Sequence, residues 1–125
     1  PKRQRATVIV ERDDALVVVQ TRQGLWLLPG GGVTRGELPI AAAARELHEE
    51  TGLQATALTF LFPHESETNV HHVFHAVAAG DPQASDDAAD LVLLREQSHL
   101  LALAMSLATC YIIDRFRKTW HAGPA

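Results

Sequence analysis

The chain has 125 residues, 46% of them hydrophobic, and a formal net charge of −4 at pH 7. This length fits one domain, so residues 1–125 are predicted to form a single folding unit with an ordinary globular core. The negative charge argues against broad binding of nucleic-acid polymers, and no apolar run is long enough to predict a transmembrane helix. Long polymers and membranes are therefore not expected partners.

The first predicted elements are two strands. Ala6 to Val10 and Ala15 to Gln20 are rich in β-branched residues and are separated by four charged residues, which predicts a hairpin or an adjacent strand pair. The basic residues that precede them, Lys2, Arg3 and Arg5, are expected to fray in solvent.

A helix is predicted from Pro39 to Thr51. Proline suits a first helical position because its missing N–H would have no intrahelical partner, and Gly52 suits the position just past the end. At about 100° per residue, one side of this helix gathers the residues predicted to face the core, namely Ile40, Ala43, Ala44, Leu47 and Thr51.

Carboxylates gather on a second side of the same helix. Glu46, Glu49 and Glu50 lie there, with the small Ala42 as the only other member. Like charges three and four positions apart repel one another, so a cation is the simplest explanation. Hard oxygen ligands select Mg²⁺ or Mn²⁺, and Mg²⁺ tends to share its coordination shell with substrate phosphates. The backbone carbonyl of Gly30, in the glycine run before the helix, is a plausible further ligand.

Arg45 falls on the remaining side of the helix. From there its guanidinium can reach Glu49 one turn later or fold back toward Glu37 in the preceding loop. We therefore predict that Arg45 orients carboxylates and does not bind the metal.

The spacing of these residues resembles a known family. Gly31, then Glu37 after five residues, then the run Arg45 to Leu53 after seven more, resembles the complete signature of the Nudix hydrolases. Leu25 to Gly31 is similar to the strand and turn that lead into that signature. The resemblance implies an α/β fold, an α/β/α sandwich with a mixed β-sheet between helices. It also implies a metal-dependent pyrophosphohydrolase that cleaves a nucleoside diphosphate linked to another group.

The resemblance also implies roles for individual residues. It assigns metal binding to Gly30, Glu46, Glu49 and Glu50, and it assigns the fastening of loop to helix to Glu37 and Arg45. In this chemistry Mg²⁺ or Mn²⁺ neutralises the diphosphate and lowers the pKa of the water that attacks phosphorus. The general base is left open between Glu46 and a residue of a separate loop.

A further acidic ligand is expected downstream, before the last helix. Asp90 is the first choice, at the start of a short strand predicted over residues 90–94, with Asp86 and Asp87 as alternatives. Glu65 and Glu67 are further possibilities, and a solvated acidic loop is the plain alternative to all of them. Family members more often offer Glu here, which leaves the role of an Asp open.

Residues 54–61 and 70–79 are predicted to be extended, and four histidines lie in or near them. On a strand, His71 and His75 share one face while His72 takes the other, so spacing alone forms no tetrahedral zinc set with His64. His71 and His75 are predicted to line the substrate cleft. Arg22 and Arg35, in loops beside the glycine turn, are predicted to contact phosphates. Trp26 and Phe74 either stack on a base or belong to the core.

The last predicted element is a helix over residues 98–118. Its apolar residues exceed what one buried stripe requires, which permits either a helix-mediated homodimer or a wide core-facing surface: Leu100, Leu101, Leu103, Leu107, Tyr111, Ile112, Ile113 and Phe116. The only cysteine, Cys110, is predicted to be a buried small hydrophobe of this helix. A lone cysteine and no evident secretory segment favour the cytoplasm.

Substrate choice is inferred by exclusion. The chain lacks the tyrosine of dinucleoside polyphosphate hydrolases and the proline of ADP-ribose hydrolases, since Pro63 comes too early, and it shows no extended element of the coenzyme A type. Small nucleotides, and among them nucleoside triphosphates including oxidised or damaged ones, are the expected substrates. The alternative is a catalytically silent nucleotide-binding or regulatory module. Such modules usually lose an acidic residue of the signature, and this chain keeps all four.

Overall fold

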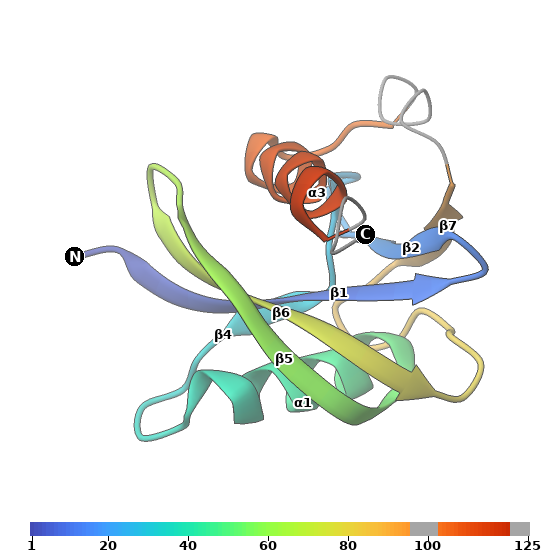
Figure 1. Ribbon diagram of the computed structural model, residues 1–125, viewed down its shortest axis with the longest axis horizontal. Helices are drawn as coiled ribbons and strands as arrows, with labels where there is room; N and C mark the ends of the chain where they lie inside the picture. The colour runs from blue at the N-terminus through green and yellow to red at the C-terminus, as the bar shows by residue number, and fades with distance from the viewer. Residues whose placement is uncertain (96–102, 121–125) are drawn as a thin grey trace.

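A computed structural model describes residues 1–95 and 103–120. A β-sheet lies between helix α1 on one side and helix α3 on the other (Figure 1). The elements in chain order are β1 (Arg3–Arg12), β2 (Ala15–Gln20), β3 (Trp26–Leu27), β4 (Gly30–Gly32), α1 (Pro39–Thr51), β5 (Gln54–Glu65), β6 (Asn69–Ala79), β7 (Asp90–Leu94) and α3 (Leu107–Thr119). The predicted α/β/α sandwich is confirmed.

The sheet is mixed. Its main strand order is β3-β2-β1-β6-β5, with β4 paired to β1 and β7 paired to β2. β1 runs parallel to β6, with Thr7 opposite Val73, and the other pairs are antiparallel. β1 therefore pairs with three strands, of which β2 follows it directly and β4 and β6 come later in the chain. The glycine strand β4 is thus held at the edge of β1.

A two-residue turn joins β1 and β2. Asp13 and Asp14 have φ angles of 50° and 65°, and Arg12 pairs with Ala15 across the hairpin. Two successive positive φ values are typical of the type I′ turn, whose twist matches that of the strands. The predicted hairpin is confirmed, but β1 begins at Arg3. The basic residues Arg3 and Arg5 are thus part of the sheet and not a frayed end.

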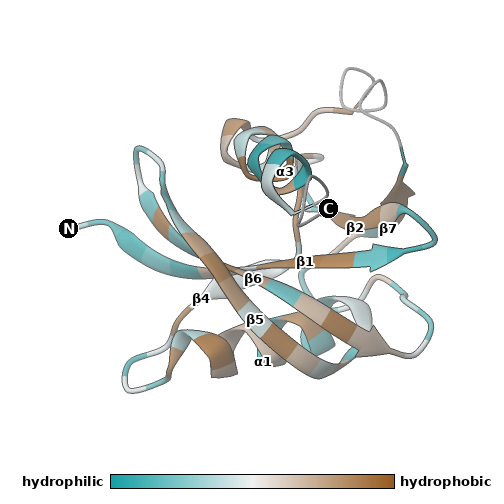
Figure 2. Ribbon diagram, viewed as in Figure 1, coloured by the Kyte–Doolittle hydropathy of each residue, from teal (hydrophilic) through white to brown (hydrophobic). Residues whose placement is uncertain are grey.

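Two apolar cores lie on opposite faces of the sheet. On the α3 side, Ile9 and Val73 pack with Phe116, and on the α1 side Val8 packs with Leu47. The middle of β1 is hydrophobic and both of its ends are hydrophilic (Figure 2). Trp26 is buried in the first core and Phe74 in the second, so both belong to the core and neither presents a free face for stacking on a base.

The start of the last helix differs from the prediction. α3 begins at Leu107, where the Ser106 side chain caps it by accepting a hydrogen bond from the Thr109 N–H at 3.1 Å. Before the cap the chain is extended, and Met105 forms a parallel bridge with Trp26. The apolar residues at 103–105 therefore pack at β3 and are not part of the helix. Residues 98–102 of the predicted helix lie outside the described residues.

Helix α1 has the predicted bounds, but its buried face is rotated. Gly52 follows it with φ 74° and donates its N–H to the His48 carbonyl at 2.9 Å. Ala42 is fully buried, whereas Ile40 is 43% exposed, opposite to the prediction. The reason is that α1 packs across β4 and β1 as well as β5, which turns the Ala42 side toward the glycine strand.

The burial of Cys110 and the length of the helices can also be compared with the predictions. Cys110 lies in α3 and is half-buried, so it is more exposed than predicted. Within residues 1–95 and 103–120, no helix is long and apolar enough to cross a membrane.

Candidate active site

The site begins with the close approach of β4 to β1. Gly30 pairs with Thr7 and has a φ of 153°, and a Cβ at this position would lie 2.1 Å from the carbonyl oxygen of Ala6. A side chain at position 30 would therefore collide with backbone, which only glycine avoids. This contact lets the backbone of β4 pair closely with β1.

The next glycine makes room for a carboxylate. A Cβ on Gly31 would lie 2.4 Å from the carboxyl carbon of Glu46. The Glu46 side chain thus folds directly over the glycine backbone. The missing side chain of Gly31 therefore provides the space that the Glu46 carboxylate occupies.

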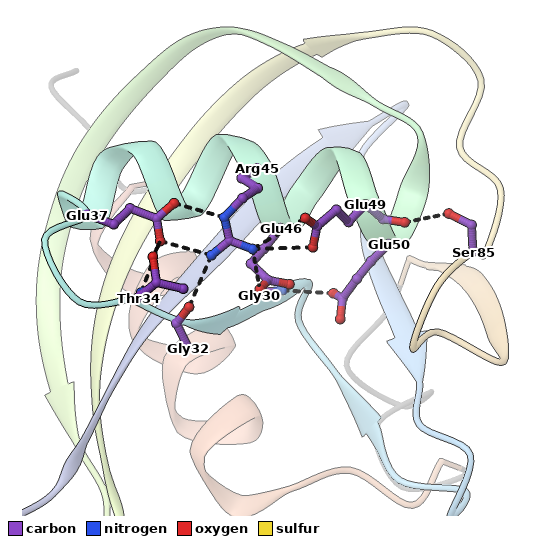
Figure 3. A network of polar contacts seen from close by, with 9 residues as sticks. All are labelled: Gly30, Gly32, Thr34, Glu37, Arg45, Glu46, Glu49, Glu50 and Ser85. Carbon is purple, nitrogen blue, oxygen red and sulfur yellow. Dashed lines mark hydrogen bonds and ion pairs between the residues drawn. The ribbon is translucent and has the colours of Figure 1, made fainter.

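Arg45 connects the carboxylates of the loop and the helix. Its Nε and Nη2 donate to the two oxygens of Glu37 at 2.8 and 2.9 Å, and its Nη1 donates to Glu46 at 2.9 Å and to Glu49 at 3.3 Å. Figure 3 shows the guanidinium between Glu37 on one side and Glu46 and Glu49 on the other. The structure shows both predicted contacts of Arg45, the one to Glu49 and the one back to Glu37, together with the contact to Glu46.

Glu37, at the loop end of this network, accepts several hydrogen bonds. Hydrogen bonds from Arg45, and from the Thr34 N–H and hydroxyl, lower the pKa of Glu37 to about 2. The same pairing raises the pKa of the Arg45 guanidinium above its usual value. Arg45 Nη2 also donates to the Gly32 carbonyl at 3.2 Å. Loop, helix and glycine strand are therefore joined by one side chain, whose planar fork suits a carboxylate.

Glu50 faces inward. It is only 9% exposed, and its Oε1 accepts a hydrogen bond from the Gly30 N–H at 3.0 Å. Burial raises the pKa of Glu50 to about 7, although the Gly30 N–H and Arg5 act in the opposite direction. A buried carboxylate with so little compensating charge is the type of group that a bound cation stabilises.

These groups surround a cavity of about 170 Å³ whose lining includes Gly30, Glu46, Glu50, Asp87 and Arg5. Among the described residues, no group of three or more His, Cys, Asp or Glu side chains is arranged as a ready metal site. Arg45 bonds both Glu46 and Glu49. The donor set, which consists of carboxylates and a backbone carbonyl, nevertheless fits a hard cation in kind.

Of the acidic residues predicted downstream as a further metal ligand, only one lines the carboxylate cavity. Asp87 lines the carboxylate cavity. Asp90, the first choice from the sequence, is exposed at the start of β7 and accepts a hydrogen bond from the neighbouring Leu91 N–H at 2.8 Å. Glu65 pairs with Lys2 at 2.9 Å at the far end of β5, and Glu67 is exposed in the turn between β5 and β6. Asp86, like these three, is not part of the cavity lining. The structure thus brings Asp87, and not the other four candidates, to Glu46 and Glu50.

A second cavity of about 260 Å³ adjoins the first and shares Arg5 and Leu27 with it. His71 is 6% exposed and lines this cavity, and its Nδ1 lies 2.8 Å from the Thr7 hydroxyl. Its Nε2 is buried and has no hydrogen-bond partner within residues 1–95 and 103–120. Burial, followed by the nearby Arg5, lowers the pKa of His71 to about 4. His71 is therefore neutral at pH 7. Its predicted role in a substrate cleft stays a prediction.

The remaining predicted substrate residues lie elsewhere. The His75 ring stacks on Trp120 with centroids 4.6 Å apart and has its Nε2 3.4 Å from Glu11, on the α3 side of the sheet. Arg22 donates to the Asp86 carbonyl at 3.1 Å, and Arg35 is exposed between β4 and α1. Neither His75 nor Arg35 lines either of the two cavities.

Sequence reasoning missed Arg5. It donates to the Leu28 carbonyl at 3.1 Å and to the Thr7 hydroxyl at 3.3 Å, and it lines both cavities. The available signal was a basic residue directly next to a β-branched run, which is also consistent with a strand residue that lies at a ligand cleft.

Several known proteins resemble this chain in sequence and fold. A NUDIX domain model matches residues 1–110. The structure of a nudix hydrolase family member from Chromobacterium violaceum is 30% identical, with a TM-score of 0.85, and the alignment covers 94% of this chain and 78% of that one. The ORF135 protein of E. coli is 27% identical with a TM-score of 0.77, over 99% and 94% of the two chains.

Two other similar proteins are named for an activity. The RNA pyrophosphohydrolase of Bartonella clarridgeiae is 62% identical over 34 residues, which are 27% of this chain and 20% of that protein. The match thus spans about a fifth of the length of such curated relatives. A bifunctional NMN adenylyltransferase/ADP ribose pyrophosphatase of Francisella tularensis, complexed with AMP and a Mn ion, shares the fold at 23% identity and a TM-score of 0.76, over 94% of this chain and 42% of that one.

Fold and site together define an α/β domain in which a glycine strand and an arginine-linked helix hold carboxylates around a cavity. With the match over residues 1–110 and the structural likeness, the chain belongs to the Nudix hydrolase family.

Proposed function

We propose that this chain is a Mg²⁺- or Mn²⁺-dependent pyrophosphohydrolase that cleaves nucleoside triphosphates, including oxidised or damaged ones, by attack of water at phosphorus. The observation that carries the proposal is the cavity that Glu46, Glu50 and Asp87 line beside Gly30. Three carboxylates from two separate segments converge there, and the arginine that ties the helix to the loop holds Glu46.

The metal ligands would be the carboxylates of Glu46, Glu49 and Glu50 and the carbonyl of Gly30. Asp87 replaces Asp90 as the proposed additional ligand, because Asp87 lines the cavity and Asp90 does not. When bound, the cation neutralises the phosphate chain and lowers the pKa of the attacking water. Glu49 is not part of the cavity lining; its side chain is 39% exposed and lies 3.3 Å from Arg45, so as a ligand it would have to leave the guanidinium.

The chain's own residues would supply the other functions. Glu46 and Asp87 line the cavity and are the two candidates to take the proton from the attacking water. Arg45 keeps Glu46 in place through its bond of 2.9 Å, as an orienting partner of a metal ligand does.

The neighbouring cavity fits the nucleoside. Among the described residues its lining includes no carboxylate; it offers the hydroxyls of Thr7 and Thr109 and the amide of Asn69, with Leu25 and Leu27 as apolar walls. Such a lining suits a neutral planar group with hydrogen-bonding edges. Arg5 lies on the boundary with the carboxylate cavity, where it can contact a phosphate oxygen. We therefore favour Arg5 over Arg22 and Arg35 as the phosphate-binding arginine.

The test is a phosphate-release screen with Mg²⁺ or Mn²⁺. Substrates are nucleoside triphosphates, damaged nucleotides, ADP-ribose, dinucleoside polyphosphates and 5′-triphosphate RNA, the last because of the name of the curated relatives. Glu49→Gln and Glu50→Gln are measured alongside Glu67→Gln, a matched change at an exposed carboxylate. Turnover of one class that collapses in the first two variants and persists in the third supports the proposal. Nucleotide binding without turnover of any substrate would favour the silent module.

A further inference from the structure

The C-terminal end of α1 is completed by a distant loop. The last four carbonyls of a helix have no intrahelical partner. In α1 the first of them, that of His48, accepts the Gly52 N–H at 2.9 Å. The other three belong to Glu49, Glu50 and Thr51, and two of these residues carry carboxylates of the proposed metal site. Whatever binds these carbonyls is therefore held close to that site.

The loop of residues 80–89, between β6 and β7, binds all three. Ser85 takes two of them, because its hydroxyl donates to the Glu49 carbonyl and its N–H donates to the Glu50 carbonyl at 3.0 Å. The Gln83 N–H donates to the Thr51 carbonyl at 2.9 Å. The contact of the Ser85 hydroxyl is visible at the end of the helix in Figure 3. Of these three bonds, only the one from the hydroxyl depends on a side chain.

Immediately after Ser85 the chain turns toward the cavity. Asp86 has a φ of 57°, and the Ala88 N–H returns to the Ser85 carbonyl at 3.0 Å, which closes a tight turn. Arg22 donates to the Asp86 carbonyl in this turn at 3.1 Å. The next residue, Asp87, is exposed to solvent and lines the cavity with Glu46 and Glu50.

We propose that Ser85 is a positioning residue: its hydroxyl and N–H set the register of the loop 80–89 on α1, so that the Asp87 carboxylate meets the carboxylates of the helix. The inference rests on the proposed function, in which Asp87 is a metal ligand. It adds that the placement of Asp87 depends on a serine that touches neither metal nor substrate.

The experiment measures Mn²⁺ affinity by electron paramagnetic resonance, with no substrate present. Removing a partner that orients a metal ligand costs on the order of 10-fold or more in affinity. We expect Asp87→Asn to weaken binding about 10-fold and Ser85→Ala about 3- to 10-fold, while Ser85→Thr, which keeps the hydroxyl, stays within about twofold of the original. The double variant should bind no more weakly than Asp87→Asn alone, because residues that act through one another are not additive.

Thr119→Ala is the matched control. It removes a hydroxyl that donates to the Arg115 carbonyl at 2.8 Å on α3, away from the cavity, and should leave Mn²⁺ affinity unchanged. Thermal unfolding of each metal-free variant checks that it is folded. The proposal is overturned if Ser85→Ala keeps the original affinity, or if it weakens binding by the same factor with and without the Asp87 carboxylate.

The two proposals fail in different ways. Intact Mn²⁺ binding with the expected Ser85 pattern, but no turnover of any substrate, would refute the hydrolase and leave the positioning role standing. Turnover that depends on Glu49 and Glu50, together with an unaffected Ser85→Ala variant, would do the reverse. A chain that binds no Mn²⁺ overturns both.

Discussion

Gly31 and Glu46 share one small space, since a Cβ on Gly31 would lie 2.4 Å from the carboxyl carbon of Glu46. The clash would be with the far end of a flexible side chain, so the protein can accommodate it by moving the carboxylate. Gly31→Ala should therefore fold normally but weaken Mn²⁺ binding and turnover by about 10- to 100-fold, the range typical when a metal ligand loses its orientation. Paired measurements of Mn²⁺ affinity and unfolding temperature test this.

Gly30→Ala is the informative comparison. Its Cβ would lie 2.1 Å from a backbone carbonyl oxygen, which cannot turn aside. This variant should lose stability as well as activity, by several kcal/mol, as core overpacking and backbone strain combine. Equal unfolding temperatures for the two variants would contradict the distinction.

Arg45→Lys should be costly although charge is preserved. A lysine offers no planar fork, so it cannot hold both oxygens of Glu37 and also reach Glu46 and Glu49. We expect turnover to fall about 10-fold or more. The affinity for Mn²⁺ should fall by a larger factor than the affinity for nucleotide. Arg117→Lys is the control, because Arg117 lies on α3 and donates to the backbone carbonyl of Arg95 at 3.4 Å. Similar losses in both would show that the fork is unimportant.

Asp87→Asn and Asp90→Asn separate the two acidic candidates. Asp87 lines the carboxylate cavity, and Asp90 bonds its own neighbour Leu91. Loss of turnover by about 10-fold or more is expected only for Asp87→Asn. Titrating Mn²⁺ against turnover in both variants decides the matter; a shift in metal dependence only for Asp90→Asn would restore the original prediction.

His71 should make stability depend on pH. Its pKa is lowered to about 4 in the folded chain from an ordinary 6.5, so the unfolded chain binds the extra proton between these values. The contribution of His71 to the free energy of unfolding is therefore complete above about pH 6.5. It declines by on the order of 2 kcal/mol as the pH falls to about 4, and below that pH it stays constant. Urea unfolding from pH 4 to 7 should show this slope, and His71→Gln should lose it. An NMR titration in which His71 protonates near pH 6.5 would contradict the expectation.

The homodimer permitted by the sequence stays a prediction; Leu100 and Leu101 lie outside the described residues, and the described part of α3 offers one apolar surface for it. Ile112, Ile113 and Phe116 are fully buried, whereas Leu107 and Tyr111 are 74% and 62% exposed one turn apart on α3. If the chain dimerises through this helix, Tyr111→Glu should shift it to monomer in sedimentation at micromolar concentration. A wild-type chain that sediments only as monomer would end the idea.

Local signals determined the part of the site that one helix contains. The proline at its start and the glycine after its end set the bounds of α1, because helix ends depend on groups within a few residues. The spacing of Glu46, Glu49 and Glu50 along one turn follows from helix geometry and was also predictable. The contact of Arg45 with Glu37, which lies in the loop before α1, was only one of two possibilities that the sequence offered.

Only the tertiary structure decided the rest. The choice of Asp87, the place of Arg5 between two cavities and the docking of Met105 on Trp26 each depend on segments that are distant in the sequence. The rotation of α1 that buries Ala42 and exposes Ile40 likewise follows from its packing on β4 and β1. A sequence pattern reports which residues lie within a turn or two of one another. Which carbonyls the Ser85 loop binds, and hence which aspartate enters the cavity, depends on long-range contacts that form only when the chain is folded.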